Sequence, residues 1–143
     1  MDRLRKEAVR LLQDIADEDL ATARVCLAAK PALVRSSAFH SQQTAEKHIK
    51  AWLIALGDDE PPTVHDLPRL ADRLATFGGG RLPLQPLQFL TKFAVAPRYA
   101  LGHVSLPEAE QALAEAEQIV ETARKAVAVL AAGDEDTQPD DHP

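Results

Sequence analysis

The segment from Phe39 to Lys50 holds the densest group of side chains that could do chemistry. It contains His40, His48, Glu46 and Lys47. A histidine can bind a metal ion or transfer a proton near neutral pH. The two histidines are eight residues apart, about two helical turns, which is too far for one metal ion without further ligands. The His-Glu-x-x-His pattern of helical zinc proteases is absent. We therefore expect no metal site here, and no motif in the chain predicts a cofactor.

Two other features have a structural explanation. Gly78-Gly79-Gly80 resembles a phosphate-binding loop in its glycines, but Arg81-Leu82-Pro83 follows where such a loop needs Lys and Ser or Thr. We expect an ordinary loop. The single cysteine, Cys26, lies in an apolar helical context, which predicts a small buried residue and excludes an intrachain disulfide.

Helical periodicity gives the polar segment a simple interpretation of its own. Glu46 and Lys50 are four residues apart, a spacing that stabilises a helix by a few tenths of a kcal/mol, about 0.3. Periodicity alone therefore favours a solvated helix face. Glu46 and Lys47 would then be structural or interface residues, and the alternative is that they line a nucleotide pocket.

The elements that must position these residues are helices. Aromatic residues make up only 4% of the chain, so the core must consist of Leu, Ala, Val and Ile, a mixture that suits helices better than strands. One stripe, Leu4, Ala8, Leu11 and Ile15, predicts that the first helix, about 4–29, is amphipathic and faces a core. A second helix, about 33–56, should end at Gly57 and pack antiparallel to the first.

Three further helices follow. Asp66 should cap a short helix over 66–75 that has Pro68 in its first turn. Pro97 limits a fourth helix, about 86–96. Ser105 and Glu108 form a capping box that begins a long helix ending near residue 132. The sequence thus predicts an all-α, up-and-down bundle of about five helices over residues 1–132 and a disordered acidic tail over 133–143.

Charge is concentrated in that tail. Its five acidic residues, with no Lys or Arg, account for most of the net charge of −6, so residues 1–132 carry only −1. A nearly neutral bundle lacks the broad basic face of a duplex-DNA binder, and a nucleic-acid partner would need a local basic site. The first ten residues alternate charge with leucine and do not form a signal peptide. We expect a cytoplasmic protein with no membrane segment.

The second helix also carries a recognisable motif. The sequence Phe39-His40-Ser41-Gln42-Gln43-Thr44-Ala45-Glu46-Lys47, followed by Lys50-Ala51-Trp52-Leu53 and Gly57, resembles the second-helix signature of the HEPN family (higher eukaryotes and prokaryotes nucleotide-binding domain). His65-Asp66-Leu67 is similar to that family's entry to its third helix, and Asp19-Leu20 fits its first. The likeness covers about Leu4 to Leu130 and implies a bundle of four to five helices that commonly forms a homodimer.

The resemblance implies an activity as well. Many HEPN proteins are metal-independent endoribonucleases, several of them toxins paired with a nucleotidyltransferase-type antitoxin. Their motif is an Arg and a His separated by four to six residues, which Arg98 and His103 match. Arg98 would then hold the scissile phosphate, and His103 would exchange a proton with the ribose 2′-OH or the leaving oxygen. Two such pairs facing each other across a dimer would form one composite site.

An alternative of a different class is a non-catalytic module. Arg98-Tyr99 also resembles the Arg-Tyr-Pro of family members thought not to cut RNA. Such a module would bind a nucleotide or a partner protein, most plausibly a nucleotidyltransferase, and Gln43, Glu46 and Lys47 are its candidate nucleotide or interface residues. A purely structural dimerisation bundle is the third reading.

Overall fold

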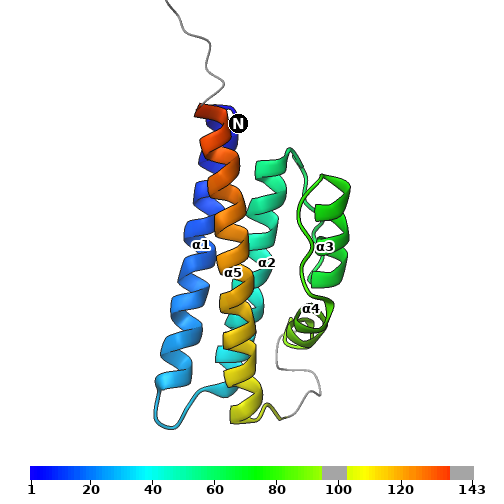
Figure 1. Ribbon diagram of the computed structural model, residues 1–143. Coiled ribbons are helices and arrows are strands. Elements are labelled where there is room, and N and C mark those ends of the chain that lie inside the picture. The colour runs from blue at the N-terminus through cyan, green and yellow to red at the C-terminus, as the bar shows by residue number, and fades with distance from the viewer. Residues whose placement is uncertain (95–102, 136–143) are drawn as a thin grey trace, which may run out of the picture.

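Five helices make up the described part of the chain. The computed structural model describes residues 1–94 and 103–135, and these contain α1 (Arg3–Ala28), α2 (Val34–Leu56), α3 (Leu67–Thr76), α4 (Leu84–Thr91) and α5 (Leu106–Glu135), with no strand. The three long helices α1, α2 and α5 run side by side, and the short α3 and α4 lie along one side of α2 (Figure 1). The predicted all-α bundle is confirmed.

The antiparallel hairpin of α1 and α2 is held together by small residues. Ala16 and Ala23 of α1 and Ala38 and Ala45 of α2 have no exposed surface, so the two helices approach each other closely. At this distance the Thr44 hydroxyl donates to the α1 backbone carbonyl of Ala16 over 2.8 Å. Ser37 does the same to the carbonyl of Ala23, also over 2.8 Å. Buried hydroxyls thus pair with helix carbonyls instead of remaining unsatisfied.

The predicted helix ends are confirmed where their capping chemistry was readable. Gly57 ends α2 with a φ of 112°, in the left-handed region that glycine tolerates. Asp66 caps α3 by accepting the backbone N–H of Arg69. Ser105 and Glu108 form the reciprocal capping box ahead of α5, with distances of 3.2 Å and 3.1 Å. These local contacts need no tertiary partner.

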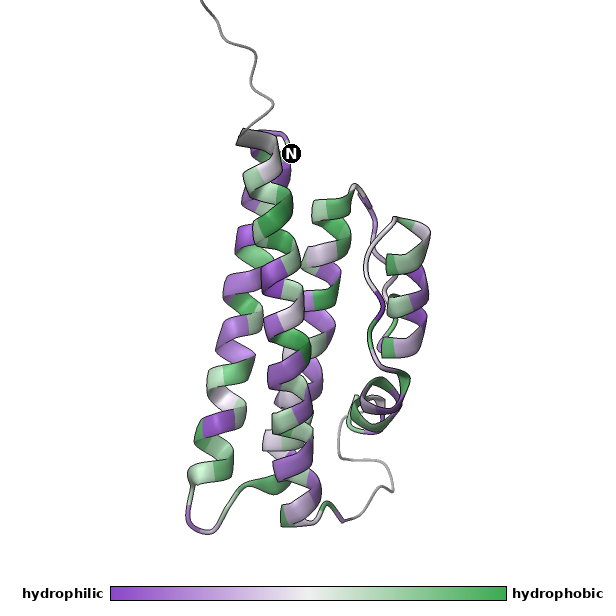
Figure 2. Ribbon diagram, in the orientation of Figure 1, coloured by the Kyte–Doolittle hydropathy of each residue, from purple (hydrophilic) through white to green (hydrophobic). Residues whose placement is uncertain are grey.

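The core is aliphatic and centred on α2. Apolar and polar residues recur along the helices (Figure 2), and the apolar ones meet between α2, α3, α4 and α5. The large side chains that are fully buried come from four of the elements and include Ile49, Leu53, Leu67, Leu70, Leu74, Leu87 and Leu90. Cys26 is buried as well, as its context predicted.

Two helix boundaries differ from the prediction. α4 ends at Thr91 instead of about residue 96, because the N–H groups of Lys92, Phe93 and Ala94 bond to carbonyls three residues back, which tightens the chain into turns. α5 continues through Gly133 to Glu135, beyond the expected end near residue 132. A glycine inside a helix costs about 1 kcal/mol but does not oblige it to stop. Residues 136–143 of the predicted tail lie outside the described residues.

A larger correction concerns α1. Leu4, Leu11 and Ile15, predicted to face the core, are exposed by 76%, 63% and 41%. The core is instead contacted by the opposite side of α1, through Val9 and Ala16 among others. The helix has two apolar faces, and the bundle covers only one of them.

Candidate functional site

The polar segment of α2 is not a solvated face. Ser41, Gln42, Thr44, Glu46 and His48 are all buried, which contradicts the interpretation that periodicity alone favoured. α2 is packed against α1, α3 and α5, so its polar residues face neighbours on several sides. The Glu46–Lys50 pair does form, at 3.1 Å, but in a buried setting.

One group of these residues joins α2 to α1. Asp19 of α1 lies with one carboxylate oxygen 2.8 Å from Nδ1 of His40 and with the other 2.5 Å from Nζ of Lys47. Asp19 is nearly buried, whereas His40 and Lys47 keep about a quarter of their side chains exposed. The carboxylate is the buried centre of this group, and the two cationic side chains form its rim.

A second group joins α2 to the segment before α3. The Glu46 carboxylate accepts hydrogen bonds from Gln42 at 3.1 Å, from His65 at 2.8 Å and from Lys50 at 3.1 Å. Burial by itself, the largest influence, raises the pKa of Glu46, but these hydrogen bonds and the charge of Lys50 together bring that pKa below its ordinary value. Two motif segments that lie 19 residues apart in sequence are therefore in contact.

A third group was not foreseen from the sequence. His48 of α2 has a fully buried side chain, and its Nε2 lies 2.9 Å from the Asp17 carboxylate of α1, which also binds Arg124 of α5. Burial lowers the pKa of His48, and the Asp17 hydrogen bond opposes that shift only in part. No sequence pattern could have linked Asp17 with Arg124, because they are 107 positions apart.

The predicted nucleotide or interface residues occupy different depths. Glu46 is buried beneath its partners and positions them instead of meeting solvent. Gln43 and Lys47 are half-buried one turn apart on α2, and Gln43 donates to the side chain of Gln42. Only Gln43 and Lys47 of the three could contact a ligand directly.

The predicted catalytic pair is only partly described. Arg98 lies outside the described residues, whereas His103 is exposed immediately ahead of α5. Hydrogen bonds from Ser105 lower the pKa of Glu108, and the charges of Lys92 and His103 add to this effect. His103 therefore lies near the first turn of α5, on the chain before the helix and not on the helix itself.

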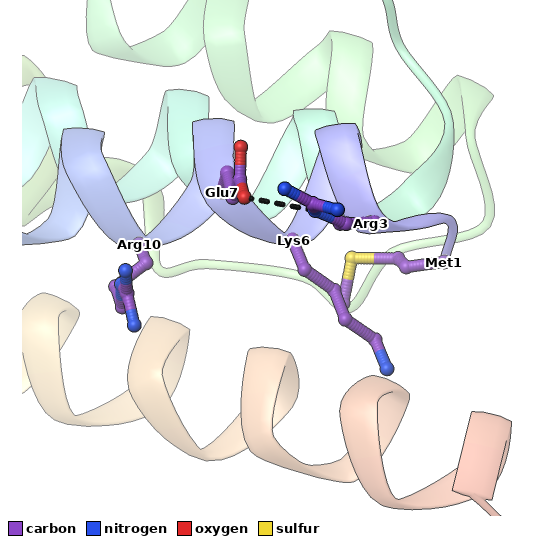
Figure 3. A pocket seen from close by; sticks show the side chains of 5 residues that line it. All are labelled: Met1, Arg3, Lys6, Glu7 and Arg10. Atoms are coloured by element: carbon purple, nitrogen blue, oxygen red, sulfur yellow. Dashed lines mark hydrogen bonds and ion pairs between the residues drawn. The ribbon is translucent and has the colours of Figure 1, made fainter.

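Grooves and metal-binding groups do not coincide with these residues. The groove in Figure 3, about 520 Å³, is lined by Met1, Arg3, Lys6, Glu7 and Arg10 at the start of α1. Among residues 1–94 and 103–135 no cluster of three or more His, Cys, Asp or Glu side chains could hold a metal ion. Within the same residues no helix is both long and apolar enough to cross a membrane.

Comparison with known proteins identifies the family. A model of the HEPN domain matches residues 9–126, which include α2, α3, α4 and most of α1 and α5. No curated protein and no solved structure matches the chain significantly. The match spans the Asp19, Glu46 and His48 groups as well as Arg98 and His103. On this evidence the chain belongs to the HEPN domain family.

Proposed function

We propose that this HEPN-domain chain is a cytoplasmic, homodimeric endoribonuclease that needs no metal ion, with Arg98 and His103 as its catalytic residues. The observation that supports it is the exposure of His103. Nothing else in the described chain hydrogen-bonds to the His103 imidazole, so a ribose or phosphate oxygen can reach it. Its position beside the α5 N-terminus also favours a negatively charged substrate.

The chemistry follows from the two residue types. The neutral imidazole of His103 accepts the 2′-OH proton while that oxygen attacks the adjacent phosphorus, and the 5′ oxygen leaves. Arg98 carries a permanent charge and donates two parallel hydrogen bonds to the phosphate as negative charge develops. A second copy would supply the other proton-transfer group. Pairing with a nucleotidyltransferase-type antitoxin would make the chain the toxin of such a pair.

A non-catalytic module is the second candidate function. It is favoured by the position of His103 before α5, since the active motif of the family is expected on a helix. The Gln43 and Lys47 side chains would then contact a nucleotide phosphate or a partner nucleotidyltransferase at the rim of the Asp19 group. This candidate requires saturable binding without turnover.

One assay separates the two. Labelled single-stranded RNA is incubated in EDTA with the wild type and with the His103→Ala, Arg98→Ala and Arg69→Ala variants, the last replacing an exposed arginine of α3 as a matched control. Cleavage by the wild type and Arg69→Ala that the other two variants lose supports the nuclease. Equal cleavage by all four reveals a contaminant and contradicts it. No cleavage, together with saturable nucleotide binding, replaces the nuclease with the module.

A further inference from the structure

The uncovered face of α1 has the spacing of a helix–helix seam. Leu4, Ala8, Leu11 and Ile15 are all exposed and follow one another at intervals of four, three and four residues. This is the spacing of the core positions in a coiled coil. Val25, which is 71% exposed, continues the same row ten residues after Ile15. We call these five residues the α1 stripe. A stripe of this length is typical of an interaction surface.

A depression borders the N-terminal half of the stripe. It has a volume of about 260 Å³ and is lined by Leu4 and Ala8 of the stripe and by Ile54 near the end of α2. Arg5 holds the two helices in place here, since it donates to the backbone carbonyl of Ile54 over 2.7 Å and pairs with Asp59. An apolar side chain from another helix could insert between Leu4 and Ile54.

The charges beside the stripe change sign along α1. Its first ten residues carry three basic side chains beyond Arg5, namely Arg3, Lys6 and Arg10, against Asp2 and Glu7. Figure 3 shows Lys6 and Arg10 pointing from α1 toward α5. From Leu11 to Ala23 there is no base, and the exposed acids Asp14 and Glu18 stand beside the stripe. An identical helix laid antiparallel would bring its acidic half to this basic half, whereas a parallel one would align like charges.

We propose that the α1 stripe is the contact between two copies of the chain and that their α1 helices pack antiparallel. This inference rests on the homodimer of the proposed function and names the surface that forms it. The contact is isologous, so each copy presents the same face and the same pair of charge halves. The length of α1, 26 residues or about 39 Å, gives the seam several turns of contact.

The oligomeric state tests the surface. Sedimentation over a range of concentrations should show a dimer for the wild type, and Leu11→Glu should weaken its association about 100-fold, because an apolar contact is lost in both copies. Val129→Glu is the matched control, since Val129 is equally solvent-facing but lies on α5. Leu11→Glu should keep the circular dichroism of a helical bundle. A monomeric wild type, or a Leu11→Glu dimer as tight as the wild type, overturns the proposal.

Crosslinking tests the orientation. In a Cys26→Ala background, a short thiol-specific crosslinker should join copies carrying Leu11→Cys, near the middle of the seam, and not copies carrying Leu4→Cys, whose ends lie apart. Efficient crosslinking through Leu4→Cys would show a parallel pair instead. The RNA assay stays independent: a dimer dependent on Leu11 without cleavage retains this interface and removes the nuclease, and cleavage with no such dimer does the reverse.

Discussion

Replacing Glu46 tests whether the polar segment of α2 is a buried network. Its side chain is 5% exposed and accepts three hydrogen bonds. In Glu46→Ala the ends of Lys50 and His65 can turn to water, because they are partly exposed. Gln42 cannot, since it is fully buried and keeps only a 3.2 Å bond to the His65 carbonyl. Stranding one buried polar group costs about 1–3 kcal/mol.

The measurement is urea and thermal unfolding followed by circular dichroism. For a chain of 143 residues, 1 kcal/mol corresponds to about 3 °C, so the melting temperature should fall by about 3–9 °C. Glu121→Ala is the matched control. Glu121 also pairs with a lysine four residues later, at 2.9 Å, but is 66% exposed, so its loss should cost less than about 0.5 kcal/mol. Equal effects of the two substitutions would refute the buried network.

The same variant has a pH signature. The pKa of Glu46 is lowered in the folded protein from 4.5, so the carboxylate stabilises the fold above that pH, and this contribution is lost as the pH falls through the folded pKa. The stability difference between the wild type and Glu46→Gln should therefore be constant near pH 7 and shrink below about pH 4.5. A difference that grows on acidification would contradict the hydrogen-bonded carboxylate.

Two further predictions concern His48 and Gly57. Because burial lowers the folded pKa of His48, the unfolded chain binds more protons below about pH 6.5, and the wild type should lose stability between pH 7.5 and pH 5.5; in urea titrations His48→Gln should lose less, and an identical loss would exclude His48 as the cause. Gly57→Ala should destabilise by about 1–2 kcal/mol through its φ of 112° alone, since an added Cβ meets nothing within 4 Å, and thermal unfolding at or above the wild-type temperature would refute that strain.

Local chemistry made much of the fold predictable. The helices, the Gly57 end, the Asp66 cap and the Ser105 capping box depend on residues close in sequence, and the HEPN motif lies in contiguous segments. The ends of α4 and α5 were less predictable, because hydrogen bonding within the last turn, and not a breaker residue, decides where α4 stops.

The tertiary structure alone decided which faces are covered. Periodicity shows that α1 has an apolar stripe at Leu4, Leu11 and Ile15, but only packing reveals that α2 and α5 cover the opposite side. In the same way, the segment from Gln42 to His48 is polar in composition, and its burial depends on partners as distant as Asp17, His65 and Arg124. A helix repeats every 3.6 residues whatever lies beside it, so its sequence defines its faces and its neighbours determine which of them are buried.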